Sequence, residues 1–91
     1  MSCCSYTIGT IVDISDIMNQ PYKFITIGKV PGDIYTYTRL VYSEETIILD
    51  HEYNEIGIED LKVGDTVVAF HSNAMTMSIP PQTIVFIIEV K

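Results

Sequence analysis

Residues 66–90 read TVVAFHSNAMTMSIPPQTIVFIIEV, which is two apolar runs joined by a loop of unusual composition. The loop, residues 71–82, holds one of the two histidines, two of the four methionines and two of the four prolines. The flanking runs are rich in β-branched residues and predict strands over Thr66–His71 and Gln82–Val90. The second run is apolar on both faces, which indicates a central strand or an interface. The two prolines lack backbone donors, so the loop is expected to stay outside any central ladder.

Four runs upstream of this unit also predict strands. They are Tyr6–Ile14, Tyr22–Gly28, Ile34–Tyr42 and Thr46–Leu49. Along the first run, alternation places four apolar side chains on one face: Tyr6, Ile8, Val12 and Ile14. Gly9, within the same run, is expected to mark a bulge or a bend.

The connections between the runs carry turn signals. Pro31-Gly32-Asp33 and Val63-Gly64-Asp65 both predict turns. Residues 50–56 are polar and predict a loop, in which Asn54 is the candidate for a positive φ. Ile58–Lys62 is long enough for a single helical turn and no more.

Five to six short strands with close turns and no long helix predict an all-β protein with a single domain over residues 1–91. Closure of the sheet would remove exposed strand edges. A small OB-like (Greek-key) barrel with at most one short helical turn is therefore preferred, ahead of an SH3-like barrel. Residues 1–5 precede the first strand and are expected to form a flexible N-terminal tail.

The formal net charge of −7 comes from twelve carboxylates against five basic side chains. Such a chain offers no basic patch to neutralise phosphates, so double-stranded nucleic acid and anionic membrane surfaces are not expected as partners. The apolar fraction of 47% argues against disorder. The longest continuous apolar run, Ile84–Ile88, is too short to span a bilayer, and no membrane insertion is expected.

Cys3 and Cys4 are adjacent, and the chain has no other cysteine, so no disulfide framework is expected. Reduced thiols and the lack of a signal peptide favour a cytoplasmic protein. If the chain is a piece of a longer secreted protein, its location would instead be extracytoplasmic.

His71, Met75 and Met77 offer one imidazole and two thioethers within seven residues, a donor set that suits Cu(I). The histidine and the M-x-M pair resemble those of small OB-fold periplasmic copper and silver chaperones. Those proteins also place a tryptophan over the metal, which this chain lacks, and their M-x-M precedes the L-K-x-G-D turn instead of following it. The alternative is that both methionines fill gaps under the loop, and no cofactor is then expected.

Two other kinds of site receive little support. A zinc site made from Cys3 and Cys4 with His51 or His71 lacks the usual separation of two to four residues between paired cysteines. For catalysis, Asp50 and Glu52 flank His51, and Ser72 follows His71. The adjacent histidine and serine do not make a triad, because neighbouring residues on a strand point to opposite faces. The chain is expected not to be an enzyme.

Aromatic residues on one barrel face are a second candidate for binding. Tyr35 and Tyr37 are expected to share a strand face, with Tyr22 and Arg39 nearby. OB barrels use such faces to stack bases, although the acidity of this chain fits a peptide or a carbohydrate better than an oligonucleotide. Ordinary cross-strand packing of the tyrosines is the competing interpretation.

The loop also resembles a family signature. Residues 74–82 read AMTMSIPPQ and follow DLKVGD at residues 60–65, an arrangement similar to small β-barrel modules of Firmicutes, particularly clostridia and bacilli. The similarity extends to GTIVDI at residues 9–14 and to residues 46–50, and Asn73 departs from it where proline is common. The resemblance implies a small β-barrel. It implies no particular activity.

These observations favour a non-enzymatic interaction module that binds another protein or itself. The expected interaction loop comprises Ser72, Asn73, Met75, Met77, Ile79, Pro80 and Pro81. Within it, Met75, Met77 and Ile79 are expected to tuck into the barrel mouth as a plug. Self-association is expected to use the two-faced strand Thr83–Glu89, which includes Ile87.

Overall fold

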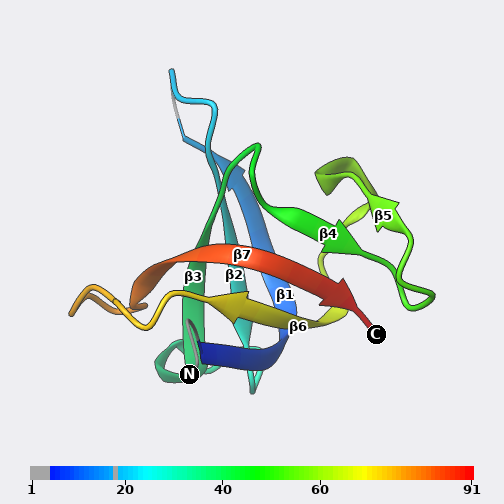
Figure 1. The fold of residues 1–91 in the computed structure, drawn as a ribbon. Coiled ribbons are helices and arrows are strands. Elements are labelled where there is room, and N and C mark those ends of the chain that lie inside the picture. Colours follow the sequence, from blue (N-terminus) through cyan, green and yellow to red (C-terminus); the bar gives the residue numbers. More distant parts are fainter. Residues whose placement is uncertain (1–4, 18) are drawn as a thin grey trace.

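Strands dominate the structure, a computed structural model that describes residues 5–17 and 19–91 (Figure 1). The strands are β1 (Ser5–Asp16), β2 (Lys23–Gly28), β3 (Tyr37–Tyr42), β4 (Ile47–Leu49), β5 (Glu55–Ile56), β6 (Thr66–His71) and β7 (Gln82–Val90). Two 3-10 turns, η1 (Ile34–Thr36) and η2 (Ile58–Asp60), are the helical elements of the described residues. The predicted strands of residues 66–71 and 82–90 match β6 and β7.

Five of the strands form a closed barrel. Strand β1 pairs antiparallel with β2 and with β6, β2 pairs with β3, and β6 pairs with β7. The barrel closes where β7 runs parallel to β3, with Arg39–Val41 beside Gln82–Ile84. This Greek-key closure confirms the predicted OB-like barrel. Strands β4 and β5 lie outside it, β4 parallel to β7 and β5 antiparallel to β4.

Strand β1 is long because it serves two neighbours, and it bends between them. Its pairing with β2 shifts register between Ile11 and Asp13, so the predicted bulge lies at Val12, three residues beyond Gly9. A Cβ at Gly9 would lie 3.1 Å from the carbonyl oxygen of Gly28, so a side chain there would crowd the backbone of β2. Gly9 is therefore a point of close strand approach.

The predicted single apolar face of this strand forms only in part, since Ile14 packs against the core but Tyr6 and Ile8 do not. Tyr6 and Ile8 point outward and are exposed, while Ile11 is completely buried. The bulge changes which side chains face inward along the strand, so a single alternation cannot describe its whole length.

The barrel interior is filled mainly by branched aliphatic side chains. Its buried members are Ile11, Ile25, Ile27, Leu40, Ile48, Leu61, Val67, Ala69, Val85 and Ile88. Two of these, Ile48 and Leu61, come from the segment outside the barrel, which therefore covers one side of the core. The turn before β6 is fixed to the barrel, since Gly64 N–H donates to the Ile11 carbonyl at 2.8 Å.

The predicted strand of residues 34–42 begins only at Tyr37, because η1 occupies its first three positions. The Asp33 carboxylate accepts a hydrogen bond from Tyr35 N–H at 3.1 Å and caps the turn. The Thr36 hydroxyl donates to the Asp33 carbonyl at 2.8 Å. These local bonds offer the backbone an alternative to the sheet ladder.

Smaller differences occur in the remaining connections. Tyr53, not Asn54, has the positive φ of 65° in the loop after β4. The end of that predicted loop forms β5, and η2 confirms the predicted helical turn. Ser5 begins β1 opposite His71, so the predicted tail of residues 1–5 is too long by that residue. Residues 1–4 lie outside the described part of the chain.

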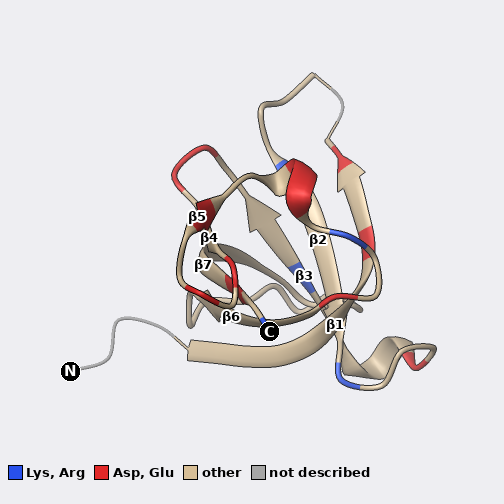
Figure 2. Ribbon diagram, turned by 90° about the vertical axis from the view of Figure 1, so that its right-hand side faces the viewer, with Lys and Arg blue, Asp and Glu red and all other residues tan. Residues whose placement is uncertain are grey.

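The acidic side chains lie mainly in turns and at strand ends (Figure 2). They cluster around β5 and η2 and are sparse on the barrel strands. The outer faces of those strands are consequently free to carry apolar side chains.

Candidate functional site

The β6–β7 loop, residues 72–81, is fixed to the barrel where it begins. Ser72 N–H donates to the Ile84 carbonyl at 2.9 Å. The Thr83 hydroxyl donates to the carbonyls of Ser72 at 3.1 Å and Ala74 at 2.8 Å. The first three loop residues are therefore tied to the start of β7.

Thr76 closes the second half of the β6–β7 loop. Its N–H donates to the Gln82 carbonyl at 3.0 Å, and Gln82 N–H donates back to the Thr76 hydroxyl at 2.9 Å. The same hydroxyl lies 2.6 Å from the Ser78 hydroxyl, which also donates to the Pro80 carbonyl. Pro80 and Pro81 have no N–H to donate. Side-chain hydroxyls provide the hydrogen bonds of this part of the loop instead, to the Gln82 N–H and the Pro80 carbonyl.

The predicted apolar plug was wrong. Met75 is 41% exposed, Ile79 63% and Met77 fully exposed, so none of the three enters the barrel. The interior is filled instead by buried aliphatic side chains from the strands and from Leu61. Pro80 is the buried member of the β6–β7 loop.

His71 points into the barrel and is only 2% exposed. Its Nδ1 lies 2.9 Å from the Ser72 carbonyl oxygen, so Nδ1 carries the proton and donates it. Its Nε2 lies 2.8 Å from the Thr7 hydroxyl, which donates to it. Both ring nitrogens therefore have partners inside the protein.

The three predicted copper ligands face different surroundings. Binding of Cu(I) by His71 would require the ring to exchange at least one of its hydrogen bonds for the metal. Met77 lies at the exposed tip of the loop, while Met75 lines a cavity. The copper hypothesis stays a prediction.

The zinc hypothesis depends on Cys3 and Cys4, which lie outside the described residues. Within residues 5–17 and 19–91, no group of three or more His, Cys, Asp or Glu side chains is placed to hold a metal ion.

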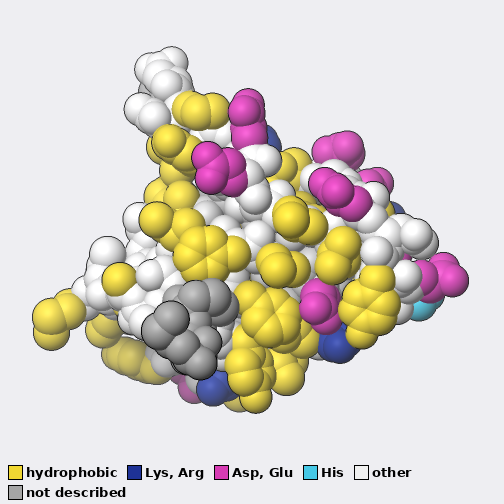
Figure 3. All heavy atoms as spheres, in the orientation of Figure 1, with side chains coloured by type: hydrophobic (Ala, Val, Ile, Leu, Met, Phe, Trp, Pro, Cys, Tyr) yellow, Lys and Arg dark blue, Asp and Glu magenta, His cyan; other side chains and the backbone are white. Residues whose placement is uncertain are grey.

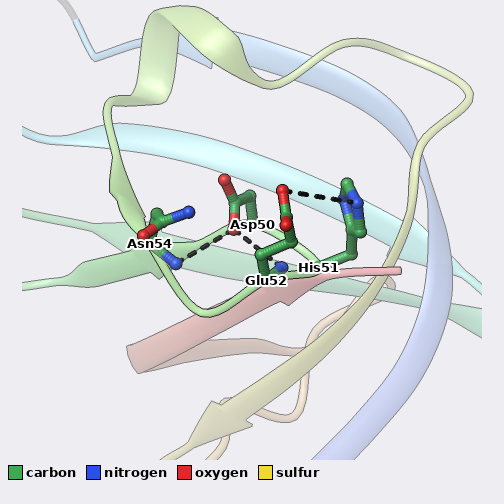
Figure 4. A network of polar contacts seen from close by, with 4 residues as sticks. All are labelled: Asp50, His51, Glu52 and Asn54. Atoms are coloured by element: carbon green, nitrogen blue, oxygen red, sulfur yellow. Dashed lines mark hydrogen bonds and ion pairs between the residues drawn. The ribbon is translucent and has the colours of Figure 1, made fainter.

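His51 lies in a tight turn after β4 (Figure 4). Its Nε2 is 3.9 Å from the Glu52 carboxylate, and both side chains are exposed. The Asp50 carboxylate accepts from the N–H groups of Glu52 at 2.8 Å and Asn54 at 2.9 Å. The Asn54 N–H contributes most to lowering the pKa of Asp50 below its ordinary value. This network stabilises the turn.

The predicted tyrosine face does not form as expected. Tyr35 sits on η1, is 81% exposed and shares no strand with Tyr37. The Tyr37 ring covers Gly28, where a Cβ would lie 2.6 Å from its Cδ1 atom. The Tyr37 hydroxyl accepts from Gly32 N–H at 2.8 Å. Packing therefore accounts for Tyr37.

Arg39, the fourth residue of the predicted tyrosine face, lies over the ring of Phe24, which was not part of that prediction. Its guanidinium carbon is 5.2 Å from the centre of the Phe24 ring, a cation–π distance. In the sheet, Phe24 pairs with Val41, and Val41 pairs with Ile84. These three side chains form an apolar row across β2, β3 and β7 on the outside of the barrel.

Two cavities meet on this row and share Val41 and Ile84. The first, about 340 Å³, continues under the β6–β7 loop, where Met75 forms part of its wall. The second, about 450 Å³, runs toward Tyr22 and Glu44. Its full lining is Pro21, Tyr22, Val41, Ser43, Glu44, Glu45 and Ile84. Together they make one open groove with Val41 and Ile84 as its floor.

The position of the groove matches the way in which OB barrels bind ligands. These folds use the outer face of the second and third barrel strands, the loop between the first two and the loop between the last two. Val41 belongs to the third barrel strand, Tyr22 ends the first connection, and Met75 lies in the last. The β6–β7 loop thus takes part in the candidate site through the groove.

A second exposed apolar surface lies over β1, β6 and β7. It consists of the exposed side chains of Tyr6, Ile8 and Phe86 together with the half-buried Phe70, and is here called the apolar patch. The Tyr6 and Phe70 rings are 6.2 Å apart and tilted by 42°. Apolar side chains gather over β6 and β7 in the space-filling view (Figure 3). The patch adjoins the groove along β7.

Comparison of the chain with protein-family models, curated proteins and solved structures finds no match. The resemblance to Firmicutes barrel modules remains an expectation from the sequence. Among the described residues, no helix has the length and apolar character needed to cross a bilayer.

The groove depends on residues that the sequence did not single out. Phe24, Val41 and Ile84 look like ordinary strand residues, and only barrel closure brings them into one row. The sequence held one signal: the run that forms β7 is apolar on both faces, and exposed apolar surface on a strand is typical of an interaction site.

Proposed function

We propose that this protein is a non-enzymatic binding module that holds a segment of another protein in the groove. The observation that supports this function is the convergence of two cavities on Val41 and Ile84, between the loops that OB barrels use for ligands. Ile84 is 56% exposed at the floor, so a ligand could bury much of its side chain.

The test is a selection of ligands from a phage-displayed library of random nine-residue peptides. Selected peptides are synthesised and titrated against the wild type and the variant Val41→Thr/Ile84→Thr. Threonine keeps the β-branched shape and the charge but removes apolar contact area. The binding free energy should weaken by roughly 1–2 kcal/mol, which raises Kd about five- to thirtyfold.

The matched control is Ile47→Thr/Val63→Thr, which changes one exposed isoleucine and one exposed valine outside the groove. Peptide affinity for this control should equal that of the wild type. Equal affinity for the groove variant as well would exclude the groove as the binding site.

The apolar patch favours a second function, self-association. Tyr6 and Phe86 are exposed on β1 and β7, and acidic residues are sparse on the barrel strands (Figure 2). Sedimentation velocity should show a concentration-dependent dimer that Phe86→Thr weakens. Tyr35→Thr serves as the control, since Tyr35 is more exposed but lies on η1.

A further inference from the structure

The two ends of the groove differ in charge. The end under the β6–β7 loop has no ionisable side chain in its lining, and its wall is formed in part by Ala74, Met75 and Thr76. At the other end, Glu44 and Glu45 are the charged lining residues. A ligand that fills the whole groove would therefore meet an apolar surface followed by negative charge.

The acidic end is a fixed turn. Thr46 N–H donates to the Ser43 carbonyl at 3.0 Å, and Ser43 N–H donates to the Thr46 hydroxyl at 3.1 Å. The buried Thr46 hydroxyl also donates to the Val85 carbonyl of β7 at 3.0 Å. The backbone that carries Glu44 and Glu45 is thus held against the strand that forms the groove floor.

The nearby basic side chains are engaged elsewhere. Lys23 forms an ion pair with Asp16, and Arg39 covers the Phe24 ring. Within residues 5–17 and 19–91, neither Glu44 nor Glu45 forms an ion pair. Their charge is therefore not neutralised by neighbouring residues in the folded protein.

The apolar end can adapt to its ligand. Met75 is flexible and polarisable, so it can pack against side chains of different shapes. The backbone around it is nevertheless fixed, because Thr76 is hydrogen-bonded to Gln82 in both directions. This combination suits recognition of an aliphatic or aromatic side chain with little preference among them.

We propose that the ligand of the groove is a cationic peptide segment, with an apolar side chain between Met75 and Ile84 and a lysine or arginine facing Glu44 and Glu45. This inference rests on the proposed function and adds the chemical class of the partner. The net charge of −7 favours the same ligand, because it raises the local concentration of cations and repels anions.

The peptide selection described above tests the partner class. The selected sequences should be enriched in Lys or Arg within a few residues of Leu, Ile, Val, Met or Phe. The affinity of the selected peptides for the variant Glu44→Gln/Glu45→Gln should be lower than for the wild type, on the order of tenfold at low salt, as expected for the loss of two exposed ion pairs. The control Glu52→Gln/Glu55→Gln removes the same charge from exposed positions outside the groove.

The outcomes separate the two proposals. Neutral or acidic peptides that require Val41 and Ile84 would overturn the cationic ligand and leave the binding function intact. Equal weakening by the two glutamate variants would attribute the effect to net charge and would also overturn the cationic ligand. Failure to select any peptide that depends on Val41 and Ile84 would overturn the binding function itself.

Discussion

At the scale of the residue, His71 is a structural polar group inside an aliphatic core. Replacing it with leucine removes the partners of the Thr7 hydroxyl and of one lone pair on the Ser72 carbonyl. Because a buried group without a partner is costly, His71→Leu should lower the free energy of unfolding by about 1–3 kcal/mol. Urea unfolding followed by circular dichroism measures the change.

Two variants identify which hydrogen bond of His71 matters. Asparagine can place a donor near the Nδ1 position and keep the bond to Ser72, so His71→Asn should cost less than His71→Leu. His51→Leu, at an exposed site, should change stability by less than about 0.5 kcal/mol. A His71→Leu protein as stable as the wild type would show that the two hydrogen bonds are dispensable.

Residue-level prediction succeeded where the backbone itself required a residue type. Gly32 and Gly64, both in predicted turns, have φ values of 96° and 103°. Prediction failed for Tyr35, which was expected on a strand. The hydrogen bond from Tyr35 N–H to the Asp33 carboxylate starts η1 there, and the alternation of apolar and polar residues carries no sign of that bond. Prediction also missed Val41, because its place in the groove follows from closure with β7.

At the scale of the element, the β6–β7 loop depends on the Thr76 hydroxyl. Thr76→Val keeps the shape of the side chain but leaves the Gln82 N–H without its acceptor. Because the loop is exposed, water can replace that acceptor, and the loss of global stability should stay within about 1.5 kcal/mol. Amide hydrogen exchange should accelerate locally at Gln82.

The control for this variant is Thr66→Val, an exposed position on β6. Its hydrogen exchange should match that of the wild type throughout the β6–β7 loop. If the Thr76 variant also matched the wild type, the backbone bond from Thr76 to the Gln82 carbonyl would suffice to fix the loop.

The turn after β4 gives a pH dependence. Backbone N–H groups, that of Asn54 first, lower the pKa of Asp50 in the folded protein. Its contribution to stability is therefore complete above the unfolded pKa of about 3.9 and is lost as pH falls through the folded pKa. The stability difference between wild type and Asp50→Asn, measured by urea unfolding, should shrink as the pH falls from 6 to 3. A difference independent of pH would contradict this assignment.

Element-level prediction was strongest for β6 and β7, whose bounds agree with the sequence pattern. Both apolar runs are bounded by turn or proline residues, so the ends of the two strands can be predicted from the sequence. Strand β1 was located, but only part of its predicted apolar face packs against the core, since the bulge after Ile11 changes the register. The position of a bulge depends on how the strand pairs with its neighbour, and the residue pattern of one strand carries no information about that pairing.

At the scale of the whole molecule, the net charge of −7 acts on both proposed surfaces, but in opposite directions. Two copies meeting at the apolar patch repel each other, so added salt should tighten the dimer by screening that repulsion. A cationic peptide in the groove is attracted, so the same salt should weaken its binding. Raising NaCl from about 0.05 M to 0.5 M shortens the screening length roughly threefold and should separate the two processes.

Each salt series needs its own variant, because the two surfaces adjoin along β7. Phe86→Thr should weaken the dimer that salt promotes and leave peptide affinity unchanged. Val41→Thr/Ile84→Thr should weaken peptide binding and leave the dimer unchanged. Sedimentation velocity and fluorescence anisotropy measure the two equilibria in the same buffers. A dimer that weakens with salt would mean that charged contacts hold it, and the apolar patch would then not be its interface.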